Sequence, residues 1–201
     1  MKNKMRRREA LGLILGSAAT TLFGTPAAAL TTLRAKALID SVVGEINRVI
    51  NSGKSERAMY AEFERIFERY ADVPIIARST LGADARRATQ AQLERFSEAF
   101  KSYLARKYGA RFREFIGSTI MVKEARPIKN YYEVASVVNL RGQPPFSVLF
   151  RVSDRSGRDL FFDIVIEGIS LGKTERTEIG AMLDKRRGDL DKLIADLAHV
   201  G

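Results

Sequence analysis

The pattern of hydrophobic and polar positions divides the chain into a helical first half and a strand-rich second half. Before Gly117, apolar residues recur every three or four positions, as on one face of a helix. After Gly117, four runs alternate apolar and polar residues and are separated by short turn sequences, which is typical of an antiparallel meander. Two further helical segments, 173–186 and 188–200, end the chain. This order predicts an α+β fold, with N-terminal and C-terminal helices packed on a four-stranded antiparallel sheet.

Capping residues predict where the first helices begin and end. A first helix is expected over 31–50, and Ser55 is a typical N-cap for a second. Asp72 is expected to cap a short third helix, with Pro74 in its first turn and Gly82 at its end. The interrupted sequence FERYADVPIIARSTLG therefore predicts a sharp corner between two helices that share one apolar interior.

The longest predicted helix begins at Thr89, where Gln92 three residues later completes a capping box. Its apolar positions continue at helical spacing to Phe115 and are unusually aromatic. Periodicity alone favours a filled core over a ligand cavity for this stripe.

Asp163 interrupts the most apolar of the predicted strands, 159–168. Strict alternation places Asp163 on the solvent face. The alternative is a buried carboxylate with a raised pKa that acts as a catalytic base.

Residues 1–29 are typical of an export signal. A basic start that includes Arg6–Arg8 precedes a short apolar run and the small residues Ala27–Ala29, which predicts cleavage before Leu30. Adjacent arginines fit either the general secretory or the twin-arginine route. An uncleaved anchor is less favoured, because the apolar run is short and rich in small residues. Cleavage would leave residues 30–201 as one α+β domain. The leader would remove five of the 34 basic residues and one of the 24 acidic residues, leaving a net charge of +6.

The composition excludes several kinds of chemistry. The chain has no cysteine, and its single histidine, His199, lies two residues from the end, so thiol chemistry and histidine-based triads are excluded. No glycine-rich phosphate loop follows a strand, and the basic residues are dispersed among acids, unlike a nucleic-acid footprint. We therefore expect a non-enzymatic protein without a metal, a cofactor or a nucleic-acid partner. The many apolar faces are compatible with a hydrophobic ligand.

Several ordered blocks of the sequence are similar to one family. INSGKSERAMYAEFERIFERYADVPIIARSTLG, RRATQAQLERFSEAFKSYLARKYGARF, RGQPPFSVLFRV and DIVIEGISLGKTERTEIGAML resemble the MlaC/toluene-tolerance family of periplasmic phospholipid-binding proteins. The blocks cover about residues 38–197.

The resemblance implies a monomeric periplasmic carrier that contributes to the lipid asymmetry of the outer membrane. Such a carrier moves phospholipid between an outer-membrane lipoprotein/porin complex and the substrate-binding ring of an inner-membrane ABC transporter. Its acyl chains would lie between the helices and a curved antiparallel sheet, in a hydrophobic cavity that leaves the head group outside.

The resemblance also gives candidate site residues. Tyr108 and Pro145–Phe150 fall in blocks that would line or border the cavity. Arg78 is expected either to form an ion pair with Asp72 or to lie at the cavity mouth. This sequence departs from the family at Asp84 and Ala85, where an aromatic pair is usual. The full set of candidate lipid-binding residues is Phe63, Phe67, Ile76, Leu81, Phe96, Phe100, Tyr103, Leu104, Tyr108, Phe146, Val148, Phe150, Phe162 and Ile164.

Two other functions remain open on the sequence. One is an enzyme on a cone-shaped α+β scaffold, with Asp163 or a tyrosine acting inside the cavity. The other is an adaptor that binds anionic membranes through its basic residues, in which case moderate salt should abolish binding.

Overall fold

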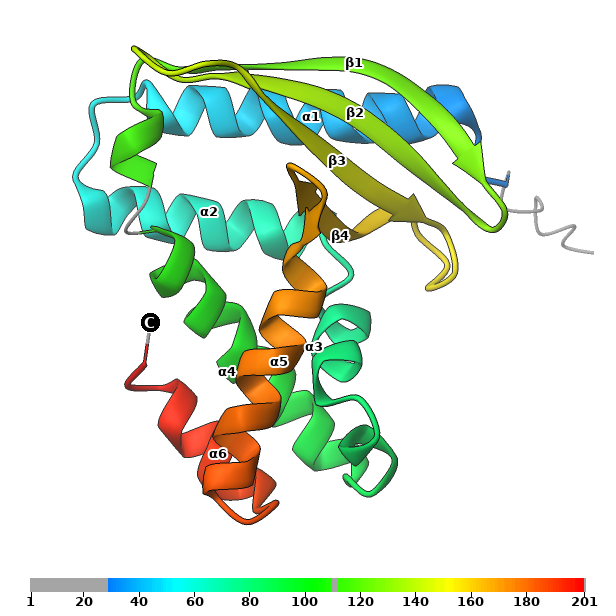
Figure 1. Cartoon of the computed structure of the whole chain (residues 1–201), viewed down its shortest axis with the longest axis vertical. Coiled ribbons are helices and arrows are strands. Elements are labelled where there is room, and N and C mark those ends of the chain that lie inside the picture. Colours follow the sequence, from blue (N-terminus) through cyan, green and yellow to red (C-terminus); the bar gives the residue numbers. More distant parts are fainter. Residues whose placement is uncertain (1–28, 110–111, 201) are drawn as a thin grey trace, which may run out of the picture.

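The centre of the fold is a strongly curved antiparallel sheet of five strands that follow one another in chain order (Figure 1). The computed structural model describes residues 29–109 and 112–200, so the predicted leader, apart from Ala29, lies outside the described residues. The strands are β1 (Thr119–Ile128), β2 (Tyr131–Asn139), β3 (Phe146–Ser153), β4 (Leu160–Ile166) and β5 (Ile169–Ser170). The predicted α+β class is confirmed. The sheet has one more strand than expected, because β5 is only two residues long and shows no alternation in the sequence.

Helices cover one side of this sheet and extend beyond it. The helices are α1 (Thr32–Ile50), α2 (Glu56–Tyr70), α3 (Val73–Leu81), α4 (Gln90–Gly109), α5 (Leu171–Lys185) and α6 (Leu190–Leu197), with short 3-10 turns η1 (Asp84–Arg86) and η2 (Phe112–Phe115). In Figure 1, α1 runs along the sheet, α2 lies beside α1, and α3 to α6 form the lower part of the molecule. The helices before and after the sheet therefore meet below it.

The longest helix is shorter than its apolar periodicity suggests. The pattern predicts a helix from Thr89 to Phe115, but α4 ends at Gly109 and η2 follows as a separate 3-10 turn. Gly109 lies against Tyr60 of α2, and a Cβ at this position would lie 2.6 Å from the Tyr60 ring. A glycine is therefore required where these two helices approach each other.

The predicted N-caps are confirmed. The Ser55 hydroxyl accepts a hydrogen bond from Ala58 N, and Asp72 Oδ1 accepts one from Ile75 N. At the start of α4, Gln92 N donates to Thr89 Oγ1, and Thr89 N donates back to Gln92 Oε1. Each bond satisfies one of the backbone donors that a helix start leaves free.

The corner between α2 and α3 is also fixed to the sheet. Asp72 N donates a hydrogen bond of 2.8 Å to the carbonyl oxygen of Phe161 on β4, and Ala71 forms a parallel bridge with the same residue. Val73 and Ile76 on α3 are buried in the common core. The break in the helical pattern therefore joins two helices to one strand.

In the part of the chain that the structure describes, none of the helices combines the length and the apolar character needed to cross a membrane.

Candidate functional site

A largely apolar hollow lies between the concave sheet and α1 to α5. Its volume is about 420 Å³, and aliphatic and aromatic side chains form most of its wall. The lining residues are Val42, Ile46, Phe63, Ile66, Phe67, Ile76, Lys101, Leu104, Ala105, Tyr108, Glu114, Phe115, Leu140, Phe146, Phe150, Phe161, Phe162, Asp163, Ile164, Ile166, Leu171, Gly172 and Glu175.

Nine of the fourteen cavity candidates line this hollow. They come from α2, α3, α4, β3 and β4, and they are Phe63, Phe67, Ile76, Leu104, Tyr108, Phe146, Phe150, Phe162 and Ile164. Sequence analysis did not single out the contribution of α1, although Val42 and Ile46 belong to its apolar face. The helical spacing of Val42 and Ile46 predicts that they are buried, but not where. The packing of α1 against the sheet places them at the cavity.

The aromatic residues of α4 lie on two different faces of the helix, and three of the cavity candidates lie on the face that does not reach the cavity. Phe96, Phe100 and Tyr103 are almost fully buried but do not line the cavity. They belong to the core, and the rings of Phe96 and Phe100 stack at 5.6 Å. Lys101, Leu104, Ala105 and Tyr108 form the cavity face, at spacings of three and four residues. A one-residue step rotates a helix by about 100°, and the sequence did not show that both faces would be covered.

Two further candidates also lie in the core rather than at the cavity. Leu81 is buried in the last turn of α3, and Val148 is buried on β3 opposite Ser136 and Ile166. Both keep the burial that their apolar character predicts, but neighbouring side chains occupy the space around them.

Strand β4 departs from strict alternation, and this departure brings Asp163 to the cavity. The register of β3 and β4 shifts between Arg151 and Val152, so Phe161, Phe162, Asp163 and Ile164 in succession line the hollow. Phe161 makes edge-to-face ring contacts with Phe67 and Phe150. The expectation that Asp163 faces solvent is wrong, because a bulge reorients the side chains beside it.

Both carboxylate oxygens of Asp163 are already engaged. Oδ2 accepts hydrogen bonds from Arg151 Nη1 at 3.0 Å and from Ser170 Oγ at 2.8 Å. Oδ1 accepts hydrogen bonds from the backbone N–H groups of Ile164 and Gly172. Asp163 therefore ties β4 to β3 and to the start of α5, an arrangement that suits a structural anion better than a base.

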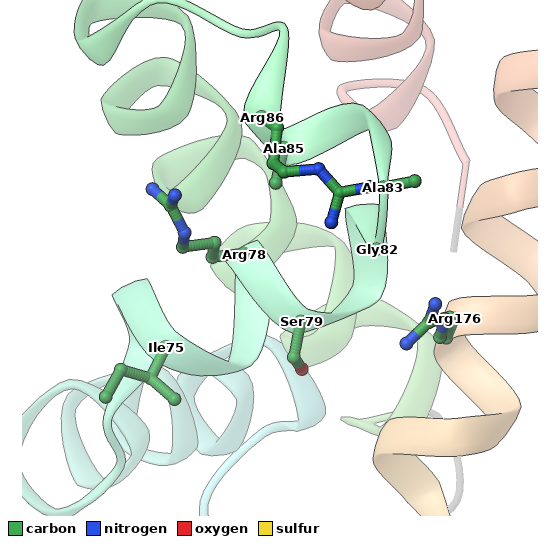
Figure 2. A pocket seen from close by; sticks show the side chains of 8 residues that line it. All are labelled: Ile75, Arg78, Ser79, Gly82, Ala83, Ala85, Arg86 and Arg176. Atoms are coloured by element: carbon green, nitrogen blue, oxygen red, sulfur yellow. The ribbon is translucent and has the colours of Figure 1, made fainter.

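Arg78 takes neither of its expected roles. It is exposed on α3 and makes no ion pair with Asp72 or with any other residue of 29–109 and 112–200. It does not line the cavity but belongs to a separate depression (Figure 2). The carboxylate of Asp72 is buried at the helix start, whereas Arg78 lies on the exposed side of α3.

A cluster of charged and hydroxyl groups lies where α4 faces α5, and two of its members, Tyr108 and Glu175, line the cavity. Lys107 Nζ donates to Glu175 Oε1 at 2.6 Å and also to Glu178, while the Tyr108 hydroxyl donates to the same Glu175 oxygen. The Tyr103 hydroxyl donates to Glu178. Glu175 is only 2% exposed, and its Oε2 is buried without a hydrogen-bond donor among the described residues. We refer to Tyr103, Lys107, Tyr108, Glu175 and Glu178 as the α4–α5 cluster.

The pKa values of Tyr103, Lys107 and Tyr108 are all raised. Burial raises the pKa of Tyr103 to about 12, and burial together with Glu175 raises the pKa of Tyr108 above its ordinary value. Burial alone would lower the pKa of Lys107, but its bonds to Glu175 and Glu178 outweigh burial and raise it. Lys107 is therefore charged, and both tyrosines are neutral donors, throughout the physiological pH range.

The described residues contain no group of three or more histidine, cysteine, aspartate or glutamate side chains placed to hold a metal ion.

The fold and the cavity define an α+β protein that encloses a hydrophobic space between helices and a curved sheet. The family model for the MlaC protein matches residues 40–199. The chain belongs to the MlaC family.

Two comparisons agree with this membership. The toluene tolerance protein ttg2D of Pseudomonas putida is 25% identical over 175 residues, which is 82% of this chain and 81% of that protein. A phospholipid-binding protein from Ralstonia solanacearum, whose structure was solved in complex with a phospholipid, has a similar fold. The TM-score is 0.68 and the sequence identity is 23%, and the match covers 82% of this chain and 98% of the other.

Proposed function

We propose that this protein is a periplasmic phospholipid carrier that binds acyl chains in the cavity and performs no chemical reaction on them. The predicted leader would export it, and it would shuttle lipid between an outer-membrane lipoprotein/porin complex and the substrate-binding ring of an inner-membrane ABC transporter. The observation that carries this proposal is the cavity of about 420 Å³, with its largely apolar wall, inside the fold of a phospholipid-binding family.

The hydrophobic effect alone provides the binding energy. Each methylene moved from water into an apolar site contributes about 0.8 kcal/mol, so an acyl chain of about 16 carbons offers roughly 12 kcal/mol before ordering costs. Aromatic rings from α2, β3 and β4 form the part of the wall where Phe67, Phe150 and Phe161 meet. An acyl chain needs only such a surface, which leaves lipid class to be selected elsewhere.

The cavity lining includes polar residues, near which the lipid head group could lie outside the apolar wall. Glu114 is exposed beside Phe115 at the end of η2, and the α4–α5 cluster closes another part of the wall. Polar head-group atoms are expected outside the apolar wall, because burying them without partners would cost several kcal/mol.

The carrier function is tested by purifying residues 30–201 after periplasmic expression in a bacterial host. We expect native mass spectrometry to show one phospholipid-bound species, and organic extraction to recover phospholipid in a stoichiometric amount. Repeating the measurement after a wash in high salt separates cavity binding from surface adsorption, since salt screens only exposed charges. Protein that is folded but free of lipid in both measurements would contradict the proposal.

A further inference from the structure

A second depression, which shares no residue with the lipid cavity, lies where the end of α3 and the η1 turn face α5. Its volume is about 590 Å³, and it is open to solvent. Figure 2 shows three arginines among small or uncharged residues, with the guanidinium of Arg78 directed away from Gly82 and Arg176. The lining residues are Ile75, Arg78, Ser79, Gly82, Ala83, Ala85, Arg86 and Arg176.

The three arginines have no acidic partner in the described structure. Arg78, Arg86 and Arg176 are exposed, and none forms a hydrogen bond or ion pair with another residue of 29–109 and 112–200. Asp84, two residues before Arg86, is paired with Arg87, and Glu175, next to Arg176, accepts hydrogen bonds from Lys107 and Tyr108; neither carboxylate lines the depression. Three positive charges therefore border one hollow that no carboxylate of these segments neutralises.

Gly82 fixes the position of one of these arginines. Its φ of +59° is in the left-handed region, which closes α3 and favours glycine. The Arg176 guanidinium lies directly against it, with Nη2 only 2.7 Å from where a Cβ would be. In Figure 2, Arg86 and Arg176 extend toward the region of Gly82 and Ala83 from opposite sides. The absence of a side chain at Gly82 thus leaves room for the guanidinium beside the exposed backbone.

Guanidinium groups in this arrangement favour a multivalent oxyanion. Each arginine offers a planar pair of N–H donors that matches two oxygens of a phosphate group. A single carboxylate carries one charge, whereas a phosphomonoester carries about −1.5 to −2 at neutral pH and three acceptor oxygens. The alanine side chains leave the hollow open enough for a projecting group to enter.

We propose that Arg86 and Arg176, with Arg78 at the rim of the depression, form a second binding site, which takes the phosphate group of a phosphate ester. This site is distinct from the acyl-chain cavity and goes beyond the proposed carrier function. The phosphate group can come from a lipid head group at a membrane surface or from a free phosphate compound, and the two sources are separable by experiment.

Inorganic phosphate is the first probe. The full mature chain is titrated with phosphate at low and constant ionic strength, with chloride as the comparison, and the backbone amide signals of Gly82 and Ala83 are followed by NMR. We expect saturable shifts with phosphate and none with chloride. Arg86→Gln and Arg176→Gln should each weaken binding about tenfold or more, because each removes charge-assisted bonds. Arg176→Lys should be intermediate, because it keeps the charge but loses the planar fork.

The matched control is Arg57→Gln. Arg57 is exposed on α2, has no partner among the described residues and lies outside the depression, so the change lowers the net charge equally. It should alter phosphate affinity less than twofold. Equal losses in Arg57→Gln and Arg176→Gln would overturn the proposal, because binding would then follow net charge alone.

Vesicles identify the source of the phosphate. Co-flotation with phosphatidylcholine vesicles that contain phosphatidic acid, lost in Arg176→Gln but not in Arg57→Gln, would support a lipid head group even if free phosphate binds too weakly to measure. Binding of inorganic phosphate without vesicle binding would support a free phosphate compound. If neither probe binds, or if only polyglutamate binds, the proposal is overturned; the second result would indicate an acidic protein segment.

Discussion

Replacing Lys107 with methionine should destabilise the protein more than the loss of an ordinary surface charge. Lys107 is the cation of the α4–α5 cluster and lies 2.6 Å from Glu175, whose side chain is 3% exposed. Without Lys107, the buried carboxylate of Glu175 loses its counter-ion. Removing one partner of a buried pair typically costs about 3–5 kcal/mol. The Lys107 side chain is itself 23% exposed, so we expect a value near the lower end, about 3 kcal/mol.

The assay is urea unfolding of delipidated protein followed by circular dichroism, which gives the free energy of unfolding by linear extrapolation. Lys192→Met is the control, because Lys192 pairs with Asp189 on the surface and should cost less than about 0.5 kcal/mol. Adding Glu175→Gln to Lys107→Met should recover about half of the loss, since it removes the uncompensated charge. The reasoning is refuted if Lys107→Met lowers the free energy of unfolding no more than Lys192→Met does. It is also refuted if adding Glu175→Gln lowers the free energy of unfolding further.

Four further predictions concern the cavity and the residues around it. Ala105→Phe should fill part of the cavity and lower the phospholipid bound per folded protein by at least half in native mass spectrometry. Phe96→Ala, outside the cavity, should cost about 3–5 kcal/mol in urea unfolding yet leave the bound lipid unchanged. Asp163→Asn should lower the free energy of unfolding by about 1–3 kcal/mol and keep stoichiometric lipid, whereas lost hydrolytic activity at unchanged stability would favour an enzyme. Stability should fall above about pH 10, because the raised pKa values of Tyr103 and Lys107 let the folded state hold protons that the unfolded state releases; a flat urea-midpoint profile up to pH 11 would contradict this.

Local chemistry explains which parts of the fold were predictable. The caps at Ser55, Asp72 and Thr89 depend on residues within three positions of each other, so the sequence shows both partners at once. The corner between α2 and α3 was predictable for the same reason. Its hydrogen bond to β4 was not, because the acceptor lies at Phe161, far along the chain.

The cavity depended on packing that periodicity does not encode. A helical period identifies buried positions but does not distinguish a filled core from a hollow one. It therefore groups Phe96 with Leu104, although the two residues lie on different faces of α4. The bulge beside Arg151 likewise moved Asp163 from the expected solvent face to the cavity wall. Lys107 and Glu175 are 68 residues apart, and no local pattern indicates that they pair.

The two sides of the cavity are held together by different kinds of bond. Backbone hydrogen bonds join the strands of the sheet, and the α2–α3 corner is anchored to β4 through the backbone of Asp72. Where α4 faces α5, side-chain hydrogen bonds from Tyr103, Lys107 and Tyr108 link the two helices. Side chains can change rotamer at much lower cost than a sheet can lose its backbone pairing. A bulkier occupant should therefore be accommodated by separation of α4 from α5, while the sheet keeps its curvature as a stiff wall.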